Sequence, residues 1–334
     1  MFFHHTSHAY AIDLGTNNTL VYAPNKGIVL DEPTSIAFDT IRQTFFDWGA
    51  SAHRIAGKNP KHIEVMHPLS KGAITNLNVA KAYIKEVIRR MVKRHWFKPL
   101  IVVSVPSDLT SMERNAVIEA CKEGGAREVR LLKDPFSAAL GSQHSIEKPE
   151  GVLVLDIGAG VTEVSLLACN GLVMSKSIRI AGNDIDQAIV EHFKNHKRVL
   201  ISLRDAEMLK KNLGAMLQTP CKTIRINVKN AITRMPEPFD VDAKDVHLAI
   251  TPIADKIVAL THAMLSSIPP SFASDVYEGG IVLTGGTSLL HGIETHLSQQ
   301  LKIVVTPVKN PLQNIIMGAG RAIEERRYAH LLGA

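Results

Sequence analysis

Cysteine is scarce in this 334-residue chain: it has three cysteines, Cys121, Cys169 and Cys221, far apart and with no C-x-x-C pair. Such spacing argues against a zinc centre or a disulfide framework and favours a reducing compartment. No apolar run approaches the roughly 18 residues of a membrane span, and the N-terminus lacks the pattern of a signal peptide. We therefore expect a cytoplasmic protein without a membrane-spanning segment.

A strong excess of one charge is also missing. Lys and Arg number 38 against 32 Asp and Glu, a net charge of +6, and the positive residues are dispersed along the chain. Nucleic-acid binding is therefore not expected. With 45% hydrophobic and 21% charged residues, the composition is that of a globular protein, and the length suits two domains or one core built twice.

Two common nucleotide-binding motifs are absent as well. The sequence contains no G-x-x-x-x-G-K-[ST], which excludes a Walker A loop. No G-x-G-x-x-G follows the first predicted strand, which argues against a Rossmann dinucleotide site. Any nucleotide must therefore be held by a different kind of loop.

What the sequence does contain is the same strand pattern twice. Three strand-like runs separated by turn residues open each half, and each set reads as an antiparallel meander. The runs are Tyr10–Asp13, Thr19–Ala23 and Gly27–Leu30 in the first half, and Gly151–Asp156, Thr162–Ala168 and Leu172–Ile178 in the second. Aligning the meanders places Asp13 with Asp156 and Gly15 with Gly158, which indicates an internal duplication of one α/β fold.

Helices and strands alternate after each meander, the pattern of a sheet covered by helices. Strands are expected at Leu100–Val105, Val129–Leu132, Ile281–Thr284 and Ile303–Thr306. Helices are expected after a capping box at Thr110–Glu113, after Asp134 as N-cap with Pro135 at N1, and over Ile250–Leu265, Ser288–Leu301 and Ile315–Arg326. Residues 33–66 and 181–247 fall outside this scheme and read as smaller inserted subdomains.

Three glycine-containing turns follow apolar strands, at Asp13–Asn17, Asp156–Gly160 and Thr284–Thr287. Glycine lets the backbone approach a ligand closely, and successive N–H groups in such turns form an anion nest. Two such hairpins facing each other across a cleft would clamp a polyphosphate. The aspartate that precedes each of the first two turns would hold the water shell of a Mg²⁺ ion.

At this point the sequence resembles the MreB family of bacterial actin-like ATPases, part of the superfamily that also holds actin and the DnaK-type ATPases. The resemblance runs over nearly the whole chain and rests on several motifs together. They are Ile12–Tyr22, Gly27–Pro33, Asp134–Gly141, Asp156–Val164, Ile268–Pro270, Gly280–Gly286 and Met317–Glu325.

The resemblance implies a duplicated ribonuclease-H-like fold, with two large domains and two inserted subdomains around a nucleotide cleft. Subdomain IA would comprise residues 1–32, 67–147 and 316–334, IB 33–66, IIA 148–180 and 248–315, and IIB 181–247. The ligands would be ATP or ADP with Mg²⁺, the metal held through water by Asp13 and Asp156.

The resemblance also implies roles for single residues. Phosphate and adenosine contacts would come from Gly15, Thr16, Asn17, Gly158, Ala159, Gly160, Glu207, Lys210, Gly285, Gly286 and Thr287. Glu207 and Lys210 lie one helical turn apart, so a surface salt bridge is an alternative for this pair.

Three departures from the family pattern concern hydrolysis. Asp134 stands where the family has a glutamate thought to position the attacking water, and it is about one methylene shorter. Gly158-Ala159-Gly160 replaces three glycines, and Val161 replaces a threonine. With Asp134, Asp13 and Asp156 as the catalytic set we expect slow ATP hydrolysis, although Asp134 would also suit a simple helix N-cap.

A basic loop carries two adjacent aromatic residues, Trp96 and Phe97. The family dips a hydrophobic loop at this place into the membrane, assisted by the N-terminus, here Phe2 and Phe3. The alternative is that both aromatics cap the core. The expected partners are further copies of the chain in paired protofilaments, the inner face of the cytoplasmic membrane and cell-wall elongation proteins.

Other functions stay open at this stage. An actin-like filament could position magnetosomes or plasmids instead of directing cell shape. A sugar or acetate kinase would share the two hairpins but transfer phosphate to a small molecule, and a DnaK-type chaperone would need an added peptide-binding domain.

Overall fold

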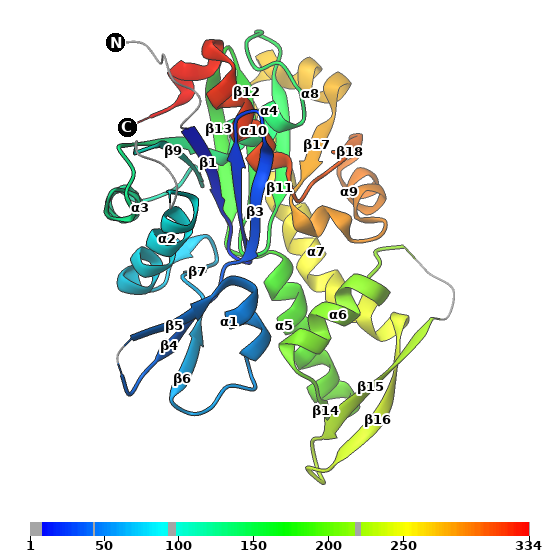
Figure 1. Ribbon diagram of the computed structural model, residues 1–334. Helices are drawn as coiled ribbons and strands as arrows, with labels where there is room; N and C mark the ends of the chain where they lie inside the picture. Colours follow the sequence, from blue (N-terminus) through cyan, green and yellow to red (C-terminus); the bar gives the residue numbers. More distant parts are fainter. Residues whose placement is uncertain (1–8, 43, 93–97, 218–221, 334) are drawn as a thin grey trace. The chain divides into compact units, whose positions relative to one another are not determined.

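The computed structural model describes residues 9–42, 44–92, 98–217 and 222–333 (Figure 1). They form two compact units. Unit 1 comprises the described residues within Met1–Pro149, Leu167–Leu172 and Leu312–Ala334, and unit 2 those within Glu150–Leu166 and Val173–Pro311.

Unit 1 is built on a five-stranded sheet in the order β10-β9-β1-β2-β3. Its strands are β1 (Ala9–Leu14), β2 (Asn18–Ala23), β3 (Gly27–Pro33), β9 (Leu100–Val105) and β10 (Glu128–Lys133). The first three strands form the predicted antiparallel meander, and β9 and β10 continue it in parallel with β1. All six side chains of β9 are buried, as its continuous apolar run predicts.

Four helices cover this sheet, two on each face. Helices α2 (Leu77–Val92) and α3 (Ser111–Gly124) bury Tyr83 and Val117 in one core cluster with Val21 of β2. The next residue, Tyr22, points to the other face because side chains alternate along a strand, and it packs against Gly320 of α10 (Asn314–Glu324). Helix α10 in turn packs on α4 (Asp134–Gly141).

Unit 2 repeats the plan with a sheet in the order β13-β12-β11-β17-β18. Its strands are β11 (Val152–Ile157), β12 (Thr162–Ala168), β13 (Gly171–Ile178), β17 (Ile281–Thr284) and β18 (Val305–Pro307). Strands β11, β17 and β18 are parallel. The core draws on α5 (Gly182–His192), α7 (Ala243–Leu265), α8 (Ala273–Gly279) and α9 (Ile293–Leu301).

The two sheets therefore have the same strand order, which confirms the internal duplication. In each, a three-stranded meander is extended by two parallel strands beside its first strand. The equivalence reaches single residues: Asp13, the last residue but one of β1, lies opposite Ser104 of β9, and Asp156, the last residue but one of β11, lies opposite Thr284 of β17. The fold class expected from the sequence is confirmed.

Smaller sheets lie within the two segments that were read as insertions. Residues 33–66 contain β4 (Ile36–Asp39), β5 (Thr44–Trp48), α1 (Gly49–Ile55) and β6 (Ile63–Met66). Residues 181–247 contain α5, a π-helical turn at Phe193–Lys197, β14 (Val199–Leu200), α6 (Leu203–Leu213), β15 (Thr223–Asn230) and β16 (Pro236–Asp242). A short hairpin of β7 (Leu69–Ser70) and β8 (Ala73–Ile74) precedes α2. The boundaries of the four subdomains stay a prediction.

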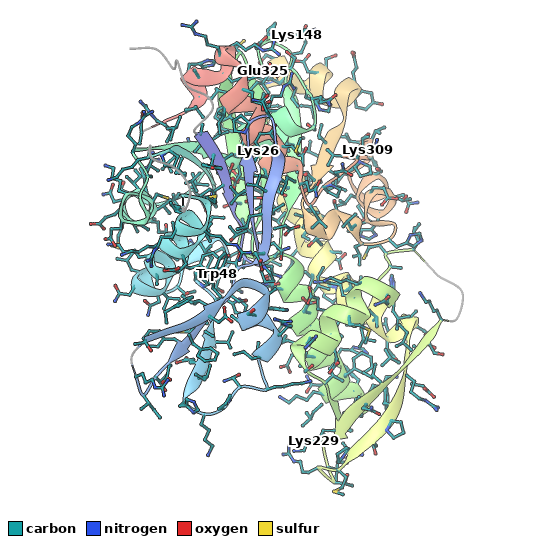
Figure 2. All side chains as sticks on the ribbon, in the orientation of Figure 1. Lys26, Trp48, Lys148, Lys229, Lys309 and Glu325 are labelled. Carbon is teal, nitrogen blue, oxygen red and sulfur yellow. The ribbon has the colours of Figure 1, made fainter. Side chains whose placement is uncertain are left out.

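One aromatic contact joins the small sheet of unit 1 to its core. Trp48 at the end of β5 (Figure 2) meets the ring of Tyr83 edge-on, with ring centroids 5.9 Å apart. The Arg90 guanidinium also contacts the Trp48 ring and lies 5.3 Å from the ring centre. Both partners of Trp48 come from α2, so this helix fixes the base of the small sheet.

Three predicted elements differ from the structure. The helix predicted over Ser288–Leu301 is split into a 3₁₀ turn, Gly286–Leu289, and α9, because Gly292 between them has φ +74°. The last strand begins at Val305, two residues late. Helix α7 starts seven residues before the predicted Ile250 and carries Pro252 in its interior.

Helix α7 is also the one helix in the described part of the chain that has the length and apolar character of a membrane span. Its residues Ile250, Ile257 and Met264 are nevertheless fully buried in the core of unit 2. The helix therefore serves as a core helix of this sheet.

Candidate functional site

The first glycine turn, in unit 1, joins β1 to β2 and is closely held from one side. The Thr34 hydroxyl donates to the Gly15 carbonyl over 2.8 Å, and the Thr34 amide donates to the Asn17 carbonyl over 2.8 Å. A side chain on Gly15 would place its Cβ 2.6 Å from the Asn18 carbonyl oxygen. Only glycine fits this turn, as its place in the motif predicted.

Asp13 lies directly before this turn, at the end of β1. Burial raises the pKa of its carboxyl group to about 7. A nearby cation would favour the charged form and lower the pKa again. Asp13 is therefore poised to ionise fully when a positive ligand binds.

The second glycine turn, in unit 2, is held through its carbonyl groups. The Gly158 carbonyl accepts hydrogen bonds from the Thr287 hydroxyl (2.7 Å) and the Gly182 amide (3.2 Å). The Ala159 carbonyl accepts one from the Asn183 amide over 2.8 Å. Two consecutive peptide planes are thus oriented by the start of α5 and by the turn after β17.

These carbonyl contacts decide where the N–H groups of the turn point. The chain contains no cis peptide bond among its described residues, and in a trans peptide the C=O and the following N–H point in opposite directions. With the carbonyls of Gly158 and Ala159 directed at α5, the amides of Ala159 and Gly160 are directed away from it. Two neighbouring N–H groups on one side form a nest for an anion.

The third glycine turn follows β17 and packs against the end of β11. Gly285 has φ +86°, and a Cβ there would lie 2.3 Å from Oδ1 of Asp156 and 2.4 Å from the Ile157 carbonyl oxygen. The Ser288 hydroxyl donates to the Gly285 carbonyl over 2.7 Å. The turn therefore brings Gly285, Gly286 and Thr287 next to the second glycine turn, Asp156–Gly160, within unit 2.

Glu207 and Lys210 both lie on α6, but they do not pair with each other. Glu207 forms a salt bridge with Lys211 over 2.7 Å. The Lys210 ammonium instead donates to Oδ2 of Asp186 (2.8 Å) and to the Gly182 carbonyl (3.0 Å). The surface salt-bridge alternative for Glu207 with Lys210 is thus wrong.

Asp186 is a residue of this site that sequence reasoning missed. It is 6% exposed on α5 and sits between apolar core positions of that helix. Its sequence neighbours give no signal, because its partner Lys210 is 24 residues away on another helix. A buried acidic residue within an otherwise apolar helix face was the one available hint.

Asp134 is the first residue of α4, and Lys133 occupies the N-cap position. The predicted N-cap position is therefore wrong by one residue. Close contacts between α4 and α10 hold the helix in place: a Cβ on Gly318 would lie 1.8 Å from the Ser137 carbonyl oxygen, and Asn314 donates to the Ala138 carbonyl over 2.9 Å. The glycine-rich motif near the C-terminus thus packs against the helix that carries Asp134.

The donor set suits magnesium better than a transition metal. In each unit an aspartate near the end of the first strand is paired in register with a hydroxyl-bearing residue of the neighbouring parallel strand: Asp13 with Ser104 of β9, and Asp156 with Thr284 of β17. These are hard oxygen donors, the kind that Mg²⁺ prefers. The described residues contain no group of three or more His, Cys, Asp or Glu arranged for a metal.

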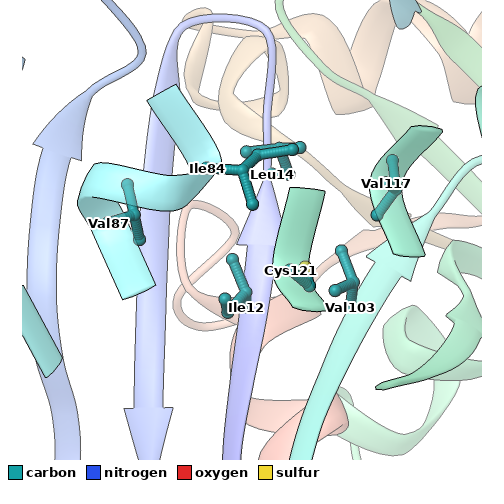
Figure 3. Close-up of a pocket in the computed structure, with 7 residues that line it drawn as sticks. All are labelled: Ile12, Leu14, Ile84, Val87, Val103, Val117 and Cys121. Atoms are coloured by element: carbon teal, nitrogen blue, oxygen red, sulfur yellow. The ribbon is translucent and has the colours of Figure 1, made fainter. Parts of the chain in front are cut away.

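A separate apolar cavity lies inside unit 1, beneath α2 and α3 (Figure 3). It offers one thiol and no charged group, and burial raises the pKa of that thiol, Cys121, to about 12. It therefore does not suit a nucleotide. Its lining residues are Ile12, Leu14, Ile84, Val87, Val103, Val117 and Cys121.

The residues predicted to contact membrane, Phe2, Phe3, Trp96 and Phe97, lie outside the described part of the chain. Lys98 directly after them is exposed. Both readings of the aromatic pair, membrane contact and core cap, therefore stay predictions.

Comparison with solved structures supports this account of the fold. The MreB5 protein of Spiroplasma citri bound to ADP matches with a TM-score of 0.90 and 27% identity, covering 94% of this chain and 95% of that one. The same protein bound to AMPPNP matches equally well. A chain of the MamK double helical filament has a TM-score of 0.80 at 20% identity and 95% and 99% coverage, which shows a shared fold.

Sequence comparison reaches the same group of proteins. The cell shape-determining protein Mbl of Bacillus cereus is 33% identical over 315 residues, 94% of this chain and 95% of Mbl. The cell shape-determining protein MreB of Haemophilus influenzae is 34% identical over 327 residues, 95% of this chain and 93% of MreB. The family model described as MreB/Mbl protein matches residues 7–330. The chain therefore belongs to the MreB/Mbl family of bacterial actin-like proteins.

Proposed function

We propose that this chain binds ATP and ADP with Mg²⁺, hydrolyses ATP slowly, and polymerises into membrane-associated filaments that direct cell shape and cell-wall synthesis. The observation that carries the proposal is the geometry of the second glycine turn, here called the second phosphate turn. Its Gly158 and Ala159 carbonyls accept hydrogen bonds from Thr287 and the start of α5, so that the Ala159 and Gly160 amides point to one side. The two Spiroplasma citri MreB5 structures, bound to ADP and to AMPPNP, support a nucleotide as the ligand.

The first turn, Gly15 to Asn17, and the second, Gly158 to Gly160, would bind the phosphates. Gly285, Gly286 and Thr287 would lie by the adenine and phosphates, with Glu207 and Lys210 at the adenosine. Asp13 and Asp156 would hold the water shell of Mg²⁺. The metal would neutralise charge that builds up on the phosphates.

Hydrolysis requires little covalent chemistry from the protein, because phosphoryl transfer depends mainly on position and charge. Asp134 would orient the attacking water from the start of α4. Its carboxylate stops about one bond short of a glutamate, and Val161 has no hydroxyl to add a hydrogen bond. Slow turnover follows, since a misplacement of about 1 Å can cost roughly a hundredfold in rate.

The cellular part of the proposal rests on family membership. The relatives are named as cell shape-determining proteins. We place the protein in the cytoplasm, peripheral on the inner face of the cytoplasmic membrane. Its partners would be further copies of itself in paired protofilaments and the cell-wall elongation proteins.

Electron microscopy of the purified protein on an anionic lipid monolayer tests this proposal. With ATP and Mg²⁺ we expect paired filaments lying on the lipid, and no filaments without nucleotide. Filaments that form in solution but not on lipid would remove the membrane part. Failure to bind a fluorescent ATP analogue would overturn the nucleotide assignment itself.

A further inference from the structure

An ion pair between two helices of unit 2 lies behind the second phosphate turn. The Lys210 ammonium of α6 is 2.8 Å from Oδ2 of Asp186 on α5, and the two side chains are 15% and 8% exposed. A pair this buried gains little net stability, because desolvation of both charges offsets their attraction. Stabilisation of the fold therefore does not explain why this ion pair is present.

The pair connects to the phosphate turn through three hydrogen bonds at the first turn of α5. Lys210 also donates to the carbonyl of Gly182, the first residue of α5. The amides of Gly182 and Asn183 then donate to the Gly158 and Ala159 carbonyls. Hydrogen bonds therefore connect Asp186, through Lys210 and the first turn of α5, to the Gly158 and Ala159 carbonyls. The orientation of these carbonyls sets the direction of the Ala159 and Gly160 amides.

The packing at this junction leaves little freedom. A Cβ on Gly182 would lie 2.7 Å from Oγ1 of Thr287 and 3.3 Å from the Gly158 carbonyl oxygen. A small tilt of α5 would therefore move the turn or break its hydrogen bonds. Whatever fixes the first turn of α5 also fixes the direction of the Ala159 and Gly160 amides.

We propose that Asp186 is a positioning residue for nucleotide binding: it holds Lys210 on the Gly182 carbonyl, and Lys210 in turn holds the first turn of α5 against the second phosphate turn. In this role Asp186 would act through Lys210 and would not itself contact a phosphate. The inference rests on the proposed function, because it concerns the same phosphate turn.

Of the two oxygens of the Asp186 carboxylate, Oδ2 accepts the hydrogen bond from Lys210. Its Oδ1 is buried and has no hydrogen-bond partner in the described part of the chain. The charged groups that act on it all come from α6: the cations Lys210 and Lys211 and the anion Glu207. Its one strong attachment is therefore Lys210, so neutralising Asp186 releases that side chain specifically.

A simple electrostatic role and a positioning role predict opposite results for Asp186→Asn. If Asp186 were only a negative charge near an anionic ligand, or only competed with the nucleotide for Lys210, its neutralisation would tighten ATP binding. If it positions α5, the same change weakens binding. We expect affinity for Mg²⁺-ATP to fall about tenfold, the lower end of the loss seen when the group that orients a ligating side chain is removed.

The experiment compares ATP-analogue binding by the full-length wild type, Asp186→Asn and Arg225→Gln, the last as a control because it breaks an exposed ion pair with Asp240 in the same unit. Arg225→Gln should bind like the wild type. Unchanged or tighter binding by Asp186→Asn, with an unchanged melting temperature, would overturn the inference. If the wild type itself fails to bind, the proposed function has failed and the positioning role falls with it.

Asp186→Asn leaves a buried ammonium without a partner and could unfold the protein, so a second variant keeps the test decisive. Asp186→Leu with Lys210→Met replaces the pair by apolar side chains, which such sites tolerate. Hydrogen exchange of the Gly182 and Asn183 amides, measured without nucleotide, should then be about tenfold faster than in the wild type. Equal protection of these two amides would also overturn the proposal.

Discussion

Asp156 and Thr284 are direct neighbours in register at the ends of the parallel strands β11 and β17. The Thr284 hydroxyl is buried and has no hydrogen-bond partner among the residues that the structure describes. A buried hydroxyl without a partner is costly, so a bound water or ion beside Asp156 would relieve it. Asp13 and Ser104 are paired in register in the same way in unit 1, but there the Ser104 hydroxyl is hydrogen-bonded to the Ser137 hydroxyl over 2.9 Å.

We predict that Asp13→Asn or Asp156→Asn weakens the Mg²⁺-dependent part of ATP binding by about ten- to a hundredfold, because each removes a carboxylate that orders the metal's water shell. Titration of a fluorescent ATP analogue in Mg²⁺ and in EDTA separates this part from metal-independent binding. Equal affinity of the wild type in the two buffers would exclude the metal.

We predict that Asp134→Glu combined with Val161→Thr increases phosphate release, since the longer carboxylate reaches the water and the added hydroxyl can hydrogen-bond it. An increase of at least about tenfold is expected, given the cost of misplacing a reacting group. Phosphate release is measured at saturating ATP so that affinity does not enter. An unchanged or lower rate means that other residues already compensate.

We predict that Gly182→Ala weakens ATP binding, because the added methyl group would lie 2.7 Å from Oγ1 of Thr287 and would displace its hydrogen bond to Gly158. Gly279→Ala is the matched control: it ends a helix of the same unit and its Cβ would meet no atom within 4 Å. Calorimetric titration with ATP should show a loss for the first variant only. The same affinity in both would show that the turn tolerates the displacement.

We predict a pH dependence of stability that originates at Asp186. Burial raises the pKa of its carboxyl group from 3.8 to about 6, with Lys210 opposing the shift. The folded state therefore binds a proton where the unfolded chain does not, so this group adds stability as the pH falls through 6. Between pH 7 and pH 5 the gain is about 1 kcal/mol.

Urea unfolding of the wild type and Asp186→Asn at pH 7, 6 and 5 measures that gain. The difference in unfolding free energy between the two proteins should shift toward the wild type as the pH falls, because titration of all other groups cancels. A shift in the other direction would mean that Lys210, and not burial, controls this carboxyl group.

We predict that Trp96→Ser with Phe97→Ser reduces co-sedimentation with anionic liposomes. Burial of one large apolar side chain in a membrane contributes on the order of 2 kcal/mol, and a basic residue near anionic lipid about 1 kcal/mol. A single subunit therefore adheres weakly, and a filament that presents many copies adheres firmly. Filament mass must be held constant between the two proteins, and equal pelleting with lipid would favour the core-cap reading.

Much of the fold was determined by short stretches of sequence. The two meanders, the buried strand Leu100–Val105 and the capping box of α3 each depend on residues within a few positions of one another. Alternating side chains, turn glycines and caps act locally, so they can be read without the structure. The equivalence of Asp13 with Asp156 also followed from sequence, because the duplication copied the whole meander.

Only the tertiary structure decided which side chains and peptide groups become partners across long distances in the sequence. The Thr287 hydroxyl donates to the Gly158 carbonyl, which is 129 positions away in the sequence. Lys210 pairs with Asp186, 24 positions away, instead of Glu207 on its own helix. The reason is that the packing of α5 against α6 places the Asp186 carboxylate next to the buried Lys210 ammonium. Glu207 is more exposed and pairs with Lys211 instead. The sequence determined where the glycine turns and the aspartates before them lie, and packing between distant segments determined which groups hold the second glycine turn, Asp156–Gly160, in place.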